Sequence, residues 1–108
     1  LSNNYLTGEI PDFQHLPNLE IFICLGNEMT GEIRNFSNTP NLKEYWCDKN
    51  SLTGEIPDFV NLPKLKRFSC NFNDLTGEIR NFSNTSNLRT YSCNFNNLTF
   101  LYCILWTK

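Results

Sequence analysis

The sequence predicts a β-solenoid, in which short parallel strands stack along one side and an irregular path returns along the other, with little or no α-helix. Two observations carry this prediction. The chain repeats every 23 residues without an insertion, and it contains no alanine, whereas asparagine is its commonest residue. Alanine favours helices and asparagine favours turns and caps, so long helices are disfavoured. A fixed period of this length indicates coils that bury their apolar sides only by stacking on one another.

Three columns of the repeat define the coil. Leu-Thr-Gly-Glu-Ile at 6–10 recurs at 29–33, where Met replaces Leu, at 52–56 and at 75–79, and leaves a trace at 98–99. The same period predicts a ladder of turn asparagines, namely Asn4, Asn27, Asn50, Asn73 and Asn96. It also predicts a column of buried thiols, namely Cys24, Cys47, Cys70 and Cys93.

Each element of a coil follows from its residues. Inward-facing Leu42, Tyr45 and Cys47 among outward-facing neighbours indicate a short strand with one buried face. The asparagine after the strand is expected to satisfy the turn backbone of its own coil and of the adjacent coil, because an amide both donates and accepts. Glycine at 8, 31, 54 and 77 fits a turn with positive φ or a close approach of coils. On the return path, phenylalanines at 13, 36, 59 and 82 form an apolar spine, and prolines at 11, 17, 57 and 63 exclude a regular helix.

One coil reads Leu42-x-x-Tyr45-x-Cys47-x-x-Asn50-x-Leu52-x-Gly54-x-Ile56-Pro57. This pattern resembles the leucine-rich repeat family, in the plant-type extracellular class found in receptor-like kinase ectodomains, polygalacturonase-inhibiting proteins and similar bacterial surface proteins. The resemblance covers residues 1–99, as a partial first coil and four coils of 23 residues. It implies a right-handed, curved leucine-rich repeat solenoid, with parallel strands on its concave face and an irregular or 3-10 convex side.

The chain departs from that family pattern in three places. Aromatic and cysteine side chains replace two core leucines, a large-plus-small pairing that keeps the core volume. Arg34 and Arg80 stand where other coils have proline, which gives the array a 46-residue double repeat. After Thr99 the pattern fails, and residues 100–108 are expected to be an irregular segment that either caps the last coil or leaves it open. Because Leu1 takes the place of Cys24, we expect a chain that begins inside a strand and belongs to a longer protein.

Composition argues against several partners and cofactors. With 9 Lys+Arg against 11 Asp+Glu the formal net charge is -2, and no basic cluster in the sequence offers nucleic acid a binding surface. The longest apolar run, at 101–106, is too short to span a bilayer. The cysteine spacing suits no metal site and no cofactor is expected, so the thiols are predicted to be small buried hydrophobes, with a cross-strand disulfide as the open alternative. Cys103, outside the column, is the thiol expected to be reactive.

No catalytic residues are expected, so the chain is not predicted to be an enzyme. His15 is the only histidine, and no nucleophile or carboxylate stands at a spacing that would make it a catalytic base. A column of glutamates should stack along an open edge rather than converge across a cleft as glycosidase carboxylates do. It is interpreted as a solvated stripe, with weak divalent-cation binding as the alternative, and it contains Glu9, Glu32, Glu55 and Glu78.

The outward strand positions vary while the framework repeats, and the resemblance implies that ligands bind there. The candidate ligand-binding residues on the concave face are Lys43, Glu44, Trp46, Asp48, Lys66, Arg67, Ser69, Asn71, Arg89, Thr90, Ser92 and Asn94. Trp46 is the best single anchor for a partner, unless it only shields neighbouring strands. Ile21, Ile23 and Leu25 beside it enlarge the apolar patch. Phe72 and Phe95 are expected to pack on one another.

The predicted function is a non-catalytic binding module, part of a larger cell-surface or secreted protein, that holds a protein or peptide ligand. By resemblance it is extracellular, without membrane insertion of this segment. One alternative is end-to-end self-association, and a weaker one is binding to ice or glycan surfaces, since a threonine recurs at 7, 30, 53, 76 and 99. N-glycosylation sequons, which matter only in a eukaryotic secretory pathway, stand at Asn35, Asn81, Asn84 and Asn97.

Overall fold

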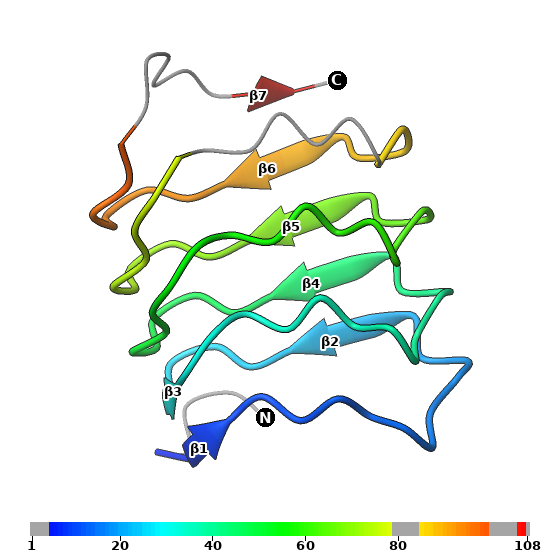
Figure 1. The fold of residues 1–108 in the computed structure, drawn as a ribbon, viewed down its shortest axis with the longest axis horizontal. Helices are drawn as coiled ribbons and strands as arrows, with labels where there is room; N and C mark the ends of the chain where they lie inside the picture. Colours follow the sequence, from blue (N-terminus) through cyan, green and yellow to red (C-terminus); the bar gives the residue numbers. More distant parts are fainter. Residues whose placement is uncertain (1–4, 79–84, 100–105, 108) are drawn as a thin grey trace.

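The chain forms a solenoid in which each coil contributes one strand to a common sheet (Figure 1). The computed structural model describes residues 5–78, 85–99 and 106–107. The sheet has the order β2-β4-β5-β6-β7. Its strands are β2 (Ile21–Ile23), β4 (Glu44–Trp46), β5 (Arg67–Ser69), β6 (Thr90–Ser92) and β7 (Trp106–Thr107). The first four are parallel and pair position by position at the 23-residue period, so the predicted parallel solenoid is confirmed.

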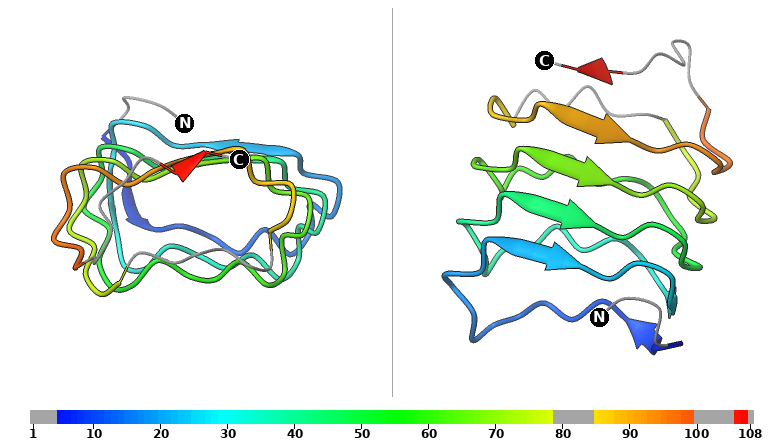
Figure 2. Two further views of the ribbon diagram at one scale, coloured as in Figure 1. Left: turned by 90° about the horizontal axis from the view of Figure 1, so that it is seen from above. Right: turned by 180° about the vertical axis from the view of Figure 1, so that it is seen from behind.

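A second line of parallel pairing, which the sequence did not predict, follows the Thr-Gly-Glu segments. Strands β1 (Thr7–Glu9) and β3 (Glu28–Thr30) form a two-stranded sheet. Isolated parallel bridges continue the line from Glu32 to Thr53 and from Glu78 to Thr99. Seen along the solenoid axis, the coils are flattened loops, with the main sheet on one long side and the return path on the other (Figure 2). The β1–β3 sheet lies at one end of the loop.

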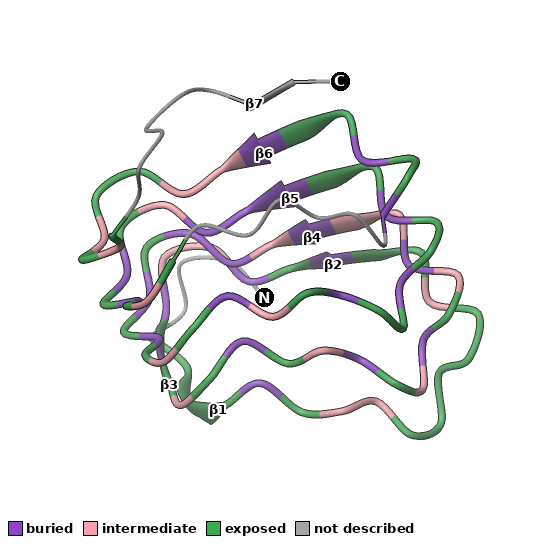
Figure 3. Ribbon diagram, turned by 45° about the horizontal axis from the view of Figure 1, so that its top comes forward, coloured by how far each residue is buried: buried purple, intermediate pink, exposed green. Residues whose placement is uncertain are grey.

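The interior of the coils is built from aromatic rings that alternate between strand and return path. Tyr45 is fully buried, and its ring lies 4.9 Å from that of Phe36 and 5.5 Å from that of Phe68. Phe68 in turn meets Phe59 at 4.8 Å and Tyr91 at 5.8 Å. Each such pair is worth about 0.5–1.5 kcal/mol beyond the area it buries. The middle residue of β2, β4, β5 and β6 is a buried aromatic residue (Figure 3). Together with the buried thiols, these rings occupy the core positions that are leucines in the leucine-rich repeat pattern.

The return path contains no helix within the described ranges. Single turns take its place, such as those closed by Leu42 N with Thr39 O at 3.1 Å and by Leu62 N with Phe59 O at 2.9 Å. Consequently no helix that is long and apolar enough to cross a membrane occurs in the described part of the chain.

Two kinds of coil differ in their return path. Where proline follows the isoleucine, the phenylalanine of the spine has a left-handed backbone, with φ of 53° at Phe13 and 54° at Phe59. Phe36, which follows Arg34 instead, is not among the residues with positive φ. There the Arg34 Nε donates to the carbonyl of Ile10 in the preceding coil at 2.8 Å. The exchange of proline for arginine thus changes both the backbone and the contact between coils.

The C-terminal segment was expected to be irregular, but two of its residues form a strand. β7 pairs antiparallel with β6, with Thr107 opposite Thr90 and Trp106 opposite Tyr91. Reversal of chain direction explains the missing repeat register, because an antiparallel strand does not follow the one-way winding of the coils. The expectations for Cys103, Arg80, Phe82 and the first four residues lie outside the described residues.

Candidate functional site

The asparagines that follow the strands fasten each coil to the one before it. Asn50 Oδ1 accepts the backbone N–H of Met29 at 3.1 Å, and its Nδ2 donates to the carbonyl of Cys24 at 2.7 Å. The same Nδ2 also donates to carbonyls of its own coil, those of Cys47 and Asp48. Asn73 and Asn96 repeat this pattern, and Asn27 accepts from Leu6 N. Asn4 lies outside the described residues.

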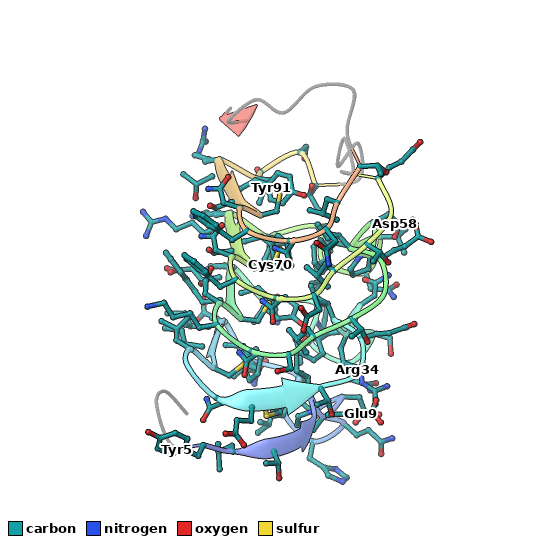
Figure 4. All side chains as sticks on the ribbon, turned by 90° about the vertical axis from the view of Figure 1, so that its left-hand side faces the viewer. Tyr5, Glu9, Arg34, Asp58, Cys70 and Tyr91 are labelled. Carbon is teal, nitrogen blue, oxygen red and sulfur yellow. The ribbon has the colours of Figure 1, made fainter. Side chains whose placement is uncertain are left out.

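The cysteine column lies inside the coils. Cys24, Cys47 and Cys70 are buried, Cys93 is partly buried, and all four are free thiols. Burial raises the pKa of the Cys24 thiol to about 11 and the pKa of Cys47 and Cys70 well above the usual value. Figure 4 shows Cys70 and Tyr91 directed into the interior. A protonated buried thiol is a poor nucleophile and a poor ligand. No group of three His, Cys, Asp or Glu residues suited to a metal ion occurs within the described ranges.

The glutamate column lies on an exposed edge of the solenoid. The side chain of each glutamate in it up to Glu55 covers a glycine of the next coil. Gly31 has φ of 79°, and a Cβ placed on it would lie 2.7 Å from Glu9 Cγ. Arg34 reaches the same carboxylate at 3.9 Å (Figure 4). A groove of about 700 Å³ runs along this edge. Its charged lining residues are four acids and one base, namely Glu9, Asp12, Glu32, Glu55 and Arg34.

The outward side chains of strands β2, β4, β5 and β6, with the residues directly flanking them, form what we call the sheet face. At its centre Glu44 Oε1 accepts a hydrogen bond from Trp46 Nε1 at 3.1 Å and lies 3.9 Å from Arg67 Nη1. Lys43 Nζ is 2.5 Å from Glu20 Oε1, a contact that lowers the pKa of the Glu20 carboxyl. Glu44, Trp46 and Arg67 are therefore one connected cluster that spans two strands.

Five of the predicted ligand-binding residues are joined in a second set of hydrogen bonds along the solenoid, which we call the polar ladder. Its members are Asp48, Ser69, Asn71, Ser92 and Asn94. Asp48 Oδ1 accepts from Ser69 Oγ at 2.5 Å and from Asn71 N at 2.7 Å. Asn71 Oδ1 repeats this with Ser92 Oγ at 2.8 Å and Asn94 N at 2.6 Å.

The expectation that Asp48 and Ser69 point into solvent is wrong, since both are buried, with 9% and 6% of their surface exposed. Neighbouring parallel strands are only about 4.8 Å apart, so a short polar side chain bonds to the next coil before it reaches water. The sequence contains the pattern of this polar ladder, because Asp or Asn recurs at 48, 71 and 94, and serine at 69 and 92.

The rest of the predicted face is exposed or half-exposed and differs from end to end. Lys66, Arg67, Arg89 and Thr90 are exposed at the β5–β6 end. Ile21 and Ile23 are 51% and 38% exposed at the β2 end. The residues exposed at the β5–β6 end all belong to the ligand-binding residues that the sequence predicts, and Lys66 and Arg89, one repeat apart, lie on adjacent coils, with Arg89 N donating to Lys66 O at 2.8 Å.

Beside the sheet face, an exposed aromatic pair closes the turn after β5 and β6. The rings of Phe72 and Phe95 stack at 4.4 Å with an interplanar angle of 6°, as the sequence predicted. Lys49 Nζ lies 5.9 Å from the Phe72 ring centre on the preceding coil. All three residues have left-handed φ, between 57° and 59°.

The sequons that the structure describes differ in their surroundings. Asn35 Nδ2 donates to Asp58 Oδ1 at 3.4 Å, and the following Phe36 is buried in the aromatic core. Asn97 is exposed. Asn81 and Asn84 lie outside the described residues, and glycosylation at any of the four stays a prediction.

Neither a family model nor a curated protein sequence matches the chain, but solved structures do. The LRR ectodomain of the plant membrane receptor kinase GASSHO1/SCHENGEN3 from Arabidopsis thaliana, in complex with CASPARIAN STRIP INTEGRITY FACTOR 2, matches 90% of this chain with a TM-score of 0.81 and 27% identity. The plant peptide hormone receptor RGFR1 in complex with RGF2 matches 90% with a TM-score of 0.82 and 35% identity. A plant ice-binding protein matches 91% with a TM-score of 0.69 and 31% identity.

These structures are much larger than the chain, which spans 12% of the first, 16% of the second and 33% of the third. The shared feature is therefore the stack of coils rather than any whole protein. In its 23-residue pattern, its asparagine ladder and its stacked coils, the chain is similar to plant-type leucine-rich repeat ectodomains.

Proposed function

We propose that the chain is a non-catalytic binding module of a cell-surface or secreted protein, and that its sheet face holds a protein or peptide ligand. The observation that carries this proposal is the contrast between framework and face. The inward residues, the asparagines and the glycines repeat from coil to coil, whereas the exposed sheet positions do not. A solenoid framework that is kept while one face varies is suited to recognition by that face.

The solved structures support this proposal in part. Two of them are plant receptors in complex with named ligands, and one of these is described as a peptide hormone receptor. Their resemblance to this chain, at 27% and 35% identity, also supports an extracellular location.

The residues proposed to contact the ligand are those of the predicted face that stay accessible. They are Lys43, Glu44, Trp46, Lys66, Arg67, Arg89 and Thr90. Trp46 is half-buried against its neighbours, with its Nε1 held by Glu44, so its ring is fixed before any partner arrives. A rigid aromatic side chain loses little entropy on binding, which makes it an effective anchor. The polar ladder is assigned to stability instead of recognition.

A selection from a random-peptide phage library on the immobilised chain tests the proposal. Peptides selected on the native chain should lose binding when Trp46→Ala and Arg67→Ala are combined, with the circular dichroism spectrum unchanged. A matched control combines Val60→Ala and Lys64→Ala, which are exposed on the return path. Equal binding by all three proteins would refute the assignment of the site.

A second candidate function, ice binding, is favoured by one specific observation. The threonines at 7, 30, 53, 76 and 99 are all exposed, one to a coil, and a plant ice-binding protein shares the fold. The glutamate column beside them adds charge that a water lattice does not accommodate. Thermal hysteresis of the chain, compared with that of a Thr53→Glu variant, decides this candidate, and no hysteresis rules it out.

A further inference from the structure

The two ends of the sheet face are chemically different. At the β2 end, Ile21 and Ile23 expose their side chains, and Ile23 is paired with Trp46 on β4. This gives an apolar surface on adjacent strands. At the β5–β6 end, the cations Lys66, Arg67 and Arg89 expose their side chains beside the uncharged Thr90. The division follows the solenoid axis, from apolar to basic.

The basic end contrasts with the charge of the whole chain. The formal net charge is -2, yet the residues from 66 to 71 and from 89 to 94 include three cations and no acid. The acid that approaches this group is Glu44, whose carboxylate lies 3.9 Å from Arg67 and is shared with Trp46. Within the described residues, no ion pair involves Lys66 or Arg89. These two cations are therefore available to an anionic partner.

The distance from Trp46 to the cations limits the spacing that a ligand would need. Trp46 is paired with Ser69, and Ser69 with Ser92, so Arg67 lies one strand across and two residues back, and Arg89 two strands across and three residues back. With strands about 4.8 Å apart and a rise of about 3.3 Å per residue, these separations are about 8 Å and about 14 Å. A polyproline II segment rises about 3.1 Å per residue and has three residues per turn, so positions i and i+3 face the same side about 9 Å apart. An extended peptide that crosses the strands would thus place every third side chain on the sheet face.

We propose that the ligand of the sheet face is an extended peptide segment with an aliphatic or aromatic residue and, three positions away, an aspartate or glutamate. The apolar residue lies against Ile21, Ile23 and Trp46, and the carboxylate lies against Lys66, Arg67 and Arg89. This inference rests on the proposed function and adds the chemistry of the ligand. A polyanion without apolar groups would use only the basic end, and a basic peptide would be repelled there.

The proposed ligand chemistry is tested with the same random-peptide phage library, and the affinity of the selected peptides is then measured in solution. The selected sequences should share an acidic residue three positions from an apolar one. Lys66→Glu should weaken the best synthetic peptide about tenfold, since charge reversal replaces attraction by repulsion at the contact. The matched control is Lys64→Glu, two residues earlier, exposed and hydrogen-bonded to Asn41, which should change affinity less than Lys66→Glu does. Raising the salt should weaken the native complex more than the Lys66→Glu complex, which keeps Arg67 and Arg89.

The other outcomes separate this inference from the proposed function. Peptides that lose binding with Trp46→Ala but bind Lys66→Glu and Lys64→Glu equally, or that share no acidic position, would overturn the inference and leave the sheet face as the site. Dextran sulfate that binds as tightly as the peptides would also overturn it, as an anion site only. Selected peptides that tolerate both Trp46→Ala and Lys66→Glu would overturn the proposed function as well. Lys66 is an exposed side chain, so its variant stays informative even if Trp46→Ala fails to fold.

Discussion

The side-chain amide of Asn50 lies 2.7 Å from the carbonyl of Cys24, which belongs to the preceding coil. Through this contact a turn in one coil completes the hydrogen bonding of the strand end in another. The same amide donates to two carbonyls of its own coil, so its removal affects its own coil and the preceding coil at once. Stability in this molecule therefore resides in the contacts between coils.

Replacing Asn50 by alanine should lower the free energy of unfolding by about 3 kcal/mol, because several buried backbone groups lose their partner together. Urea unfolding followed by circular dichroism measures the change. Asn61→Ala, at an exposed position of the return path, is the control and should stay within about 0.5 kcal/mol of the native chain. Equal effects at both positions would mean that the ladder does not hold the coils together.

The glutamate column predicts different costs for two glycines with similar backbones. Gly8 and Gly31 both have positive φ, but a Cβ on Gly8 meets nothing within 4 Å, whereas on Gly31 it meets Glu9. Both alanine variants carry a backbone cost of about 1 kcal/mol, and Gly31→Ala should cost a further 1 to 2 kcal/mol or so. Adding Glu9→Ala to Gly31→Ala should restore most of that difference in urea unfolding. A double variant no more stable than Gly31→Ala would show that the steric contact is unimportant.

Buried thiols should make the fold less stable at high pH. Burial raises the pKa of Cys24 from 9.0 to about 11, so between these values the unfolded chain loses its proton while the folded chain keeps it. The folded state then binds more protons, and stability falls as pH rises through this window, with the thiol contribution intact below pH 9. Urea midpoints at pH 7 and pH 10 measure the fall. The control is Cys24→Ala, in which the fall should be smaller; an identical fall would contradict the role of this thiol.

The polar ladder predicts that Asp48 acts on stability and not on binding. Asp48→Ala leaves the Ser69 hydroxyl and the Asn71 N–H without their acceptor, at a cost of about 2 kcal/mol. Asp48→Asn keeps an acceptor oxygen and should recover more than half of that loss. Peptides selected on the native chain should bind Asp48→Asn as before. If Asp48→Asn folds with native stability but no longer binds the peptides, Asp48 is a ligand-binding residue, as the sequence predicted.

The parts of the structure that depend only on the period could be predicted from the sequence. A 23-residue shift superimposes Tyr45 on Phe68 and Phe72 on Phe95, and the structure brings each pair into contact. In a solenoid, equivalent positions in successive coils are neighbours, so residues that are 23 apart can be expected to be in contact. The proposed binding of a ligand by the sheet face cannot be predicted from the period, because it depends on residues that do not repeat.

The features that the sequence did not predict depend on backbone conformation, on the distance between strands and on strand direction, which the 23-residue period does not determine. The repeated glycines were expected to mark a turn with positive φ or a close approach of coils, and both the positive φ and, at Gly31, the close approach are confirmed. What was missed is that Gly8 lies inside an extended segment, Thr7–Glu9, that pairs with Glu28–Thr30. Asp48 was assigned to solvent by alternation alone, which says on which side of a strand a residue lies but not how close the next strand comes. β7 runs against the winding direction, and no repeat could indicate it.

The two lines of parallel pairing, the main sheet and the Thr-Gly-Glu bridges, occupy different sides of the same flattened loop. A single line of bonds would act as a hinge about which coils could rock. Two lines on different sides oppose both shear and torsion between coils, so the stack behaves as a stiff rod. A partner that lies across several strands would then meet side chains already set at their final separations, and little of its binding energy would be lost to rearranging the surface.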